Sequence, residues 1–159
     1  MVEAVMIEPY TPHQPVSTPP GFSVVLVGGC FDILHRGHFV FLEKARQRGD
    51  YLVVALEPDQ HILERKNRPP LHTHMQRAQN LSAIRCVDKV LLLGPLKGFQ
   101  GYLQLVKDVR PSVIAITAHD PQMDNIRQQA KVIGAHVKIV TERIEPLSST
   151  AIYTRLAAS

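Results

Sequence analysis

The sequence predicts an α/β fold: one domain with a Rossmann-like five-stranded parallel sheet and helices on both faces. Short runs rich in Val, Ile and Leu alternate with longer stretches whose apolar residues recur at helical spacing. The short runs are apolar throughout, which is typical of strands buried on both faces of a parallel sheet. The chain has 159 residues, a length typical of a single domain.

The expected elements alternate along the chain from Phe22 onward. Helices are placed where apolar residues return every three or four positions, and they are bounded by breakers such as Pro69-Pro70 and Gly134. The expected strands are Ser23–Val27, Tyr51–Leu56, Lys89–Leu93, Val113–Thr117 and His136–Val140. The expected helices are Gly37–Arg48, Thr73–Arg85, Phe99–Val109, Gln122–Ile133 and Ser148–Leu156.

Residues 1–21 are expected to form a disordered, proline-rich tail ahead of a domain that spans residues 22–159. The tail has no periodic apolar face, so it cannot bury enough surface to offset the entropy of ordering it. Deleting Met1–Pro19 is therefore expected to leave the stability unchanged. The prolines in question are Pro9, Pro12, Pro15, Pro19 and Pro20.

The composition favours a small-molecule enzyme. The net charge of +4 suits polyanionic ligands such as nucleotides, and no Lys/Arg run with interleaved aromatics suggests nucleic-acid binding. Cys30 and Cys86 are expected to be free thiols in the reducing cytoplasm. No apolar run reaches the ~18 residues that span a bilayer, and no signal peptide is evident, so a cytoplasmic location without membrane contact is expected.

A strand, a glycine turn and a helix start lie together at Gly28-Gly29 and His35-Arg36-Gly37-His38. Glycines allow the backbone to approach an anion, and a helix N-terminus offers free N–H groups and the positive end of a dipole. The two histidines are three residues apart, so both rings can point at the same phosphates. The pattern is neither a P-loop nor a dinucleotide-binding fingerprint, because the glycines and lysine of those motifs are missing.

The His35-x-Gly37-His38 element resembles the H-x-G-H signature of the cytidylyltransferase-like nucleotidyltransferases. With its lead-in, Gly29-Cys30-Phe31-Asp32-Ile33-Leu34-His35, it looks most like the adenylyltransferase domain of ADP-heptose synthesis and the archaeal-type FAD synthetases. The resemblance implies that His35 and His38 are catalytic. It also implies nucleotide binding by Gly29, Cys30, Phe31, Asp32 and Gly37. Asp32 is alternatively a structural link within this loop, and Cys30 needs no nucleophilic role.

Two basic residues match the same family. The segment Lys66-Asn67-Arg68-Pro69-Pro70, with Arg77 in the following helix, resembles the family's basic loop. The resemblance implies that Lys66 and Arg77 are catalytic, balancing the charge of the leaving pyrophosphate. A solvated basic loop is the alternative.

Two further segments are expected at the same edge of the sheet. Ser148, Ser149 and Thr150 resemble the family's nucleotide-binding S-[ST]-T motif, although Ser148 could also be a simple helix cap. Asp120 resembles the aspartate that meets the nucleobase and acceptor, with a turn before Pro121 as the alternative. The chain departs from the family at Ala118 and Pro146, where relatives have glycine.

The resemblance implies transfer of a nucleoside monophosphate, preferably AMP from ATP, to a small phosphorylated metabolite with release of pyrophosphate. Mg²⁺ is expected to be held mainly by the triphosphate, with no metal site of the protein's own. The alternatives are a CTP-dependent cytidylyltransferase of the glycerol-3-phosphate or choline-phosphate type and a non-catalytic nucleotide-binding domain. The partners are the nucleotide and its acceptor, and a homodimer remains open.

Overall fold

A parallel sheet forms the centre of the molecule in the computed structural model, which describes residues 4–142 and 148–159. The strand order is β1-β4-β3-β2-β5-β6, with every neighbouring pair parallel. The strands are β1 Met6–Pro9, β2 Val24–Gly29, β3 Tyr51–Leu56, β4 Lys89–Leu92, β5 Val113–Thr117 and β6 His136–Thr141. The helices are α1 Arg36–Arg46, α2 Asp59–Lys66, α3 His74–Ser82, α4 Gly98–Val109, α5 Met123–Ile133 and α6 Ser149–Ala157.

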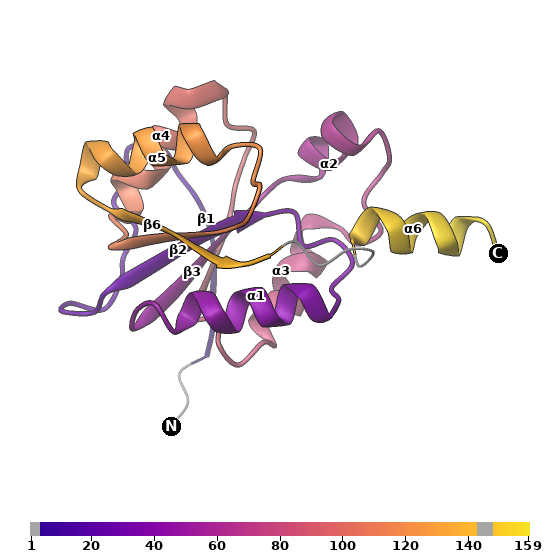
Figure 1. Ribbon diagram of the computed structural model, residues 1–159, viewed down its shortest axis with the longest axis horizontal. Coiled ribbons are helices and arrows are strands. Elements are labelled where there is room, and N and C mark those ends of the chain that lie inside the picture. Colours follow the sequence, from indigo (N-terminus) through magenta and orange to yellow (C-terminus); the bar gives the residue numbers. More distant parts are fainter. Residues whose placement is uncertain (1–3, 143–147) are drawn as a thin grey trace.

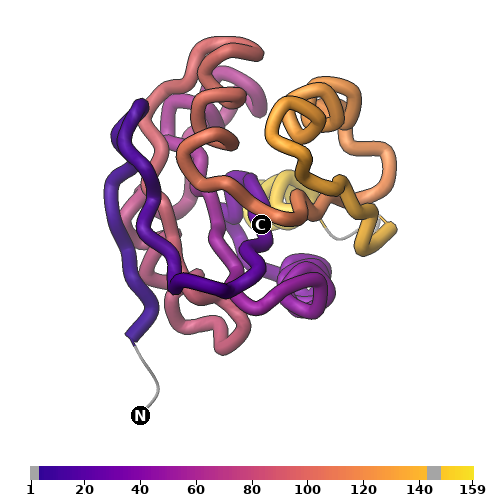
Figure 2. The backbone as a smooth tube through the Cα atoms, turned by 90° about the vertical axis from the view of Figure 1, so that its left-hand side faces the viewer, coloured from indigo at the N-terminus to yellow at the C-terminus, as the bar shows by residue number. Residues whose placement is uncertain are grey.

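Helices cover both faces of this sheet (Figures 1 and 2). Alternate residues of β2 point to opposite faces, because side chains in a strand alternate. Val25 and Val27 belong to the core that includes Leu42 of α1, whereas Val24 and Leu26 belong to the core under α4 and α5. The α/β class predicted from the sequence is therefore confirmed.

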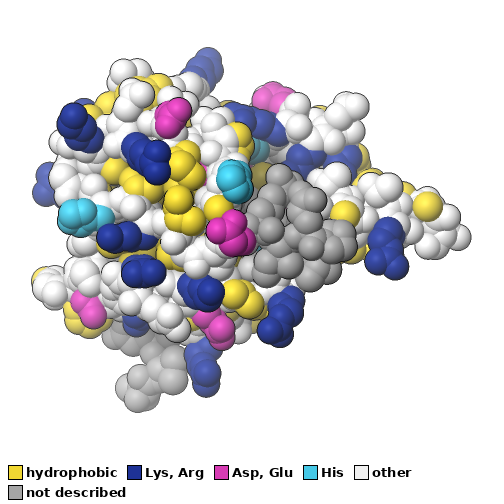
Figure 3. All heavy atoms as spheres, in the orientation of Figure 1, with side chains coloured by type: hydrophobic (Ala, Val, Ile, Leu, Met, Phe, Trp, Pro, Cys, Tyr) yellow, Lys and Arg dark blue, Asp and Glu magenta, His cyan; other side chains and the backbone are white. Residues whose placement is uncertain are grey.

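The expected elements recur with small shifts at their ends. The strands at Tyr51–Leu56 and Val113–Thr117 have the predicted bounds, and each of the five predicted helices is present within a few residues. None of the described helices is long and apolar enough to cross a membrane. On the face shown in Figure 3, Lys and Arg side chains are scattered among acidic and apolar ones.

The N-terminal segment departs from the prediction, because the sheet has six strands rather than five. Residues 6–9 pair with β4 and form an edge strand of the sheet. The described part of the expected tail therefore consists of this strand and the segment that follows it. Tyr10 is buried, and its hydroxyl donates to Asp108 at 2.7 Å. Lys89, 1% exposed, donates to Glu8 Oε1 at 2.9 Å and to the carbonyl of Ser17 at 2.6 Å. Strand pairing and buried polar contacts, which leave no periodic signal, order this segment.

We therefore expect deletion of residues 1–19 to destabilise the domain by about 3–5 kcal/mol, since the Lys89 ammonium would lose its partners. Thermal unfolding checks this. Adding Lys89→Met to the deletion should recover part of the loss, because it removes the unpaired charge. Unchanged stability on deletion alone would show that the segment contributes nothing.

Helix α2 was not expected from the sequence. Only Ile62 of this helix is buried, and Pro58 at its start makes no side-chain cap, so the sequence carries no amphipathic pattern there. The helix lies at the carboxyl end of β3, set apart from α4 and α5 (Figure 1). It brings Lys66, in its last turn, to the site described next.

Candidate active site

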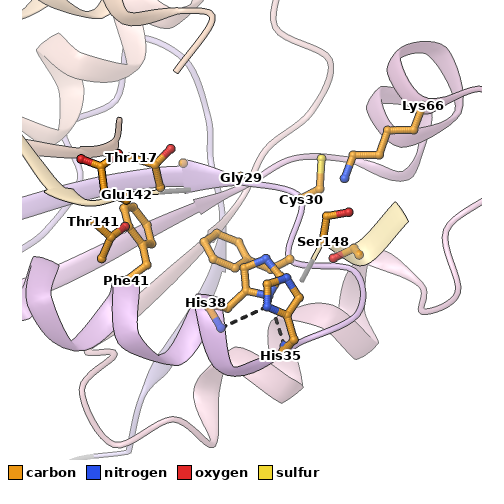
Figure 4. A pocket seen from close by; sticks show the side chains of 14 residues that line it. Gly29, Cys30, His35, His38, Phe41, Lys66, Thr117, Thr141, Glu142 and Ser148 are labelled. Carbon is orange, nitrogen blue, oxygen red and sulfur yellow. Dashed lines mark hydrogen bonds between the residues drawn. The ribbon is translucent and has the colours of Figure 1, made fainter. Parts of the chain in front are cut away.

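A cavity of about 230 Å³ lies at the carboxyl edge of the sheet (Figure 4). It is located where β2 lies between β3 and β5, the point at which the strand order reverses. Open α/β sheets bind ligands at such a switch point. The lining residues are Gly28, Gly29, Cys30, Phe31, His35, Gly37, His38, Phe41, Lys66, Thr117, Thr141, Glu142, Ser148 and Ser149.

The two histidines share one hydrogen-bonding arrangement at the start of α1. The backbone N–H of Gly37 donates to His35 Nδ1 at 3.1 Å, and that of His35 donates to His38 Nδ1 at 3.3 Å. Because each Nδ1 accepts a hydrogen bond, each neutral ring carries its proton on Nε2. The ring centroids lie 4.0 Å apart. No described residue accepts from either Nε2, so two N–H donors are available to a ligand.

Burial keeps both rings neutral. It lowers the pKa of His38 to about 3, with further lowering by the neighbouring His35 and Lys66. Burial and Lys66 also lower the pKa of His35. At neutral pH both imidazoles are therefore hydrogen-bond donors without a charge.

The depressed pKa of His38 predicts a pH dependence of stability. Between about pH 3 and the usual histidine value near 6.5, the unfolded chain binds a proton that the folded chain does not. Stability should therefore be complete above pH 6.5 and fall as the pH drops, by at most about 1.4 kcal/mol per pH unit for this group. Thermal unfolding from pH 7 to 5 should show a shallower decline in His38→Gln, and parallel curves would contradict the assignment.

The loop before these histidines has a constrained shape. Phe31 adopts a positive φ of 45°, and its ring packs against Gly29 so closely that a Cβ there would lie 2.9 Å from the ring. Glycine at this position lets the aromatic ring cover the strand end. The Phe31 ring also contacts His38, with centroids 5.2 Å apart. This packing holds the loop against the histidine pair.

Lys66 enters the cavity from the last turn of α2, on the side of Cys30 and Ser148 (Figure 4). Its ammonium adds a positive charge beside the two neutral imidazoles. Burial raises the pKa of the Cys30 thiol, and Lys66 opposes this effect. Cys30 is thus a protonated thiol at neutral pH, in keeping with its expected lack of a nucleophilic role.

Helix α6 brings hydroxyls to the cavity, but not all of the expected ones. Ser148 caps the helix by accepting from the N–H of Ala151 at 3.0 Å, and Ser149 donates to the carbonyl of Ile33 at 2.9 Å. The hydrogen bond from Ser149 holds the start of α6 against the loop that precedes His35. Thr150 is exposed and does not line the cavity. The departure at Pro146 lies outside the described residues.

Arg77 does not line the cavity, so the structure does not support the catalytic role that the resemblance implies. Its side chain is fully buried. The guanidinium donates to the carbonyls of Cys30 at 2.7 Å, Glu57 at 2.8 Å and His72 at 3.2 Å, and to Asp59 Oδ1 at 2.6 Å. Each of the three guanidinium nitrogens therefore already donates a hydrogen bond within the protein. Through these hydrogen bonds Arg77 connects the loop between β2 and α1 to the end of β3, to the first turn of α2 and to the segment before α3.

The two aspartates also lie outside the cavity. Asp32 is fully buried, and it accepts from Arg68 Nη1 at 2.7 Å and from the N–H groups of Leu71 and His72. These hydrogen bonds hold the pKa of Asp32 below its usual value despite burial. Asp32 was expected either to bind the nucleotide or to act as a structural link within the loop. The structure favours the structural link. Asp120 accepts from the N–H of Gln122 at 2.8 Å, as a turn residue before α5 does.

A family model described as cytidylyltransferase-like matches residues 26–155. The chain belongs to the cytidylyltransferase-like family. It is 38% identical to FAD synthase from Pyrococcus horikoshii over 117 aligned residues. The alignment covers 73% of this chain and 77% of that protein. It is 36% identical over 132 residues to the bifunctional protein HldE from Koribacter versatilis, covering 81% of this chain and 26% of that protein. The resemblance to these nucleotidyltransferases, predicted from the sequence, is confirmed.

Solved structures of other proteins share this fold. A lipopolysaccharide core biosynthesis protein from Thermoplasma volcanium superposes with a TM-score of 0.62 at 27% identity, over 77% of this chain and 97% of that one. The pantoate-beta-alanine ligase from Francisella tularensis superposes with a TM-score of 0.64 at 17% identity, over 96% of this chain and 77% of that one. The second likeness supports the fold alone.

Four residues that line the cavity were not predicted as site residues from the sequence. Thr117 and Thr141 end β5 and β6, Glu142 follows β6, and Phe41 projects from α1. Polar residues at or directly after the end of a strand were the signal that could have identified the first three. Among the described residues, no group of three His, Cys, Asp or Glu side chains could hold a metal ion.

Proposed function

We propose that the protein transfers AMP from ATP to a small phosphorylated acceptor and releases pyrophosphate. The observation that carries this proposal is the His35–His38 pair, whose two neutral Nε2–H donors open on one cavity beside Lys66. Donors aimed at phosphate oxygens suit a reaction in which negative charge moves between phosphates.

The relatives support adenylyl transfer in particular. FAD synthase is named for a product made when the phosphate of FMN is joined to AMP, and HldE shares about a quarter of its length with this chain. The likeness to FAD synthase favours ATP as the donor and a phosphate ester as the acceptor.

In this proposal an acceptor phosphate oxygen attacks the α-phosphorus in line, the bond to the β-phosphate breaks, and pyrophosphate leaves. His35 and His38 donate to oxygens of the α-phosphate and the leaving group, where charge builds. Lys66 balances the charge of the leaving pyrophosphate, while Ser148 and the start of α6 bind phosphate oxygens. The triphosphate supplies most ligands of Mg²⁺, because Glu142 is the sole carboxylate among the described lining residues.

Thermal unfolding with magnesium and nucleotide tests the first step. A triphosphate at a hundredfold excess over its dissociation constant should stabilise the fold by ~2.7 kcal/mol. ATP should be effective at lower concentration than CTP. The reverse order would favour the cytidylyltransferase alternative, and no shift with either at millimolar concentration would contradict the proposal.

A further inference from the structure

Glu57 is a buried carboxylate that the proposed chemistry does not use. It directly follows β3, is 7% exposed, and its Oε1 accepts from the Tyr102 hydroxyl of α4 at 2.8 Å. Its Oε2 is also buried and lies 3.4 Å from Nδ1 of His61 on α2, yet no described residue makes a hydrogen bond to it. A buried oxygen left without a hydrogen bond costs free energy. Stability alone therefore does not account for a glutamate here.

Glu57 contacts the helix that is least secured by packing. Ile62 is the one buried residue within α2, and the helix has no side-chain N-cap. Its other fixed contacts gather in its first turn, where His61 faces Glu57 and Asp59 accepts from Arg77. These contacts fix the N-terminal end of α2, while Arg68, two residues beyond Lys66, pairs with the buried Asp32 at 2.7 Å.

Lys66 lies at the opposite end of the same helix. It is five residues beyond His61, a distance of about 8 Å along a helix axis. Because Arg68 is held by Asp32, a shift of the first turn would tilt α2 about that end and change where the Lys66 side chain enters the cavity (Figure 4).

We propose that Glu57 is a positioning residue: it holds α2 through its 3.4 Å contact with His61 and α4 through the hydrogen bond from Tyr102, and so directs Lys66 onto the triphosphate. It does not touch the ligand, since it does not line the cavity. The inference rests on the proposed function, because it assigns how one phosphate-binding group of that site is held.

The substitution Glu57→Gln separates this role from a simple charge effect. Removing a negative charge beside an anion site should strengthen phosphate binding by electrostatics alone. Loss of positioning should weaken it. The two explanations therefore predict changes of opposite sign.

The experiment measures the Kd of ATP and of AMP, with magnesium, for wild type, Glu57→Gln, Lys66→Met and the double variant. We expect Glu57→Gln to weaken ATP binding about fivefold, within the range for coupled neighbouring side chains, and to leave AMP binding unchanged. The double variant should bind ATP as Lys66→Met does. Glu64→Gln is the matched control, because this exposed residue of α2 carries the same charge but contacts Gln60.

Unchanged or tighter ATP binding in Glu57→Gln, or additive effects in the double variant, would overturn the inference. A wild type that binds no triphosphate would overturn the proposed function itself, so the two failures are distinguishable. If Glu57→Gln does not fold, Tyr102→Phe replaces it, because it removes the bond to Oε1 without changing charge. It should weaken ATP binding in the same direction, and unchanged binding would count against the inference.

Discussion

Replacing His38 with alanine is expected to lower kcat for nucleotidyl transfer about 10²–10³-fold, the usual loss when one donor to a developing anion is removed. The same holds for His35→Ala. Each ring presents an Nε2–H donor that no described residue uses, so its loss should remove transition-state stabilisation. Steady-state pyrophosphate release at saturating ATP measures the effect.

Two controls separate catalysis from folding. His38→Gln should retain more activity than His38→Ala, because a glutamine amide places an N–H donor near the position of the imidazole Nε2. His136→Ala should behave as wild type, since this exposed histidine begins β6 at the opposite edge of the sheet. Full turnover in both His35→Ala and His38→Ala would refute the assigned roles.

Arg77→Met is expected to destabilise the domain by at least about 3 kcal/mol, because the carbonyls of Cys30, Glu57 and His72 would lose their donor in a buried site. Such a loss is a large part of the total stability of a small domain. Chemical denaturation with urea measures it. Arg77→Lys should recover little, because an ammonium cannot reach all these acceptors from one position.

The outcome also decides between two roles for this arginine. If Arg77→Met unfolds at the wild-type urea concentration and loses only turnover, the residue acts on the substrate, as its family pattern suggested. A lowered midpoint with nucleotide binding retained below the transition would support the structural role.

Most of the fold could be predicted because its strands are buried on both faces. The run Tyr51–Leu56 is apolar at nearly every position, so its composition predicts a strand inside the sheet, where the structure places it. The edge strand Met6–Pro9 has no such signal. It is ordered by pairing with β4 and by the contacts of Lys89, which depend on residues about eighty positions apart.

The candidate site was predictable in part for a similar reason. His35, Gly37 and His38 lie within one local turn, and their spacing already implies a shared ligand. The position of Arg77 in the sequence matched a family pattern, but burial against distant carbonyls is a property of the packed structure. Thr117 and Thr141 reach the cavity only because β5 and β6 end side by side.

The position of a radioactive label tests the proposed reaction most directly. Wild-type protein would be incubated with magnesium, a panel of phosphate monoesters that includes FMN and sugar 1-phosphates, and ATP labelled at either the α- or the γ-phosphate. The account predicts that the α-label appears in the acceptor and the γ-label in pyrophosphate, with both products forming about 10²–10³-fold more slowly in His38→Ala. A γ-label in the acceptor, or no transfer to any phosphate ester while ATP is bound, would contradict it.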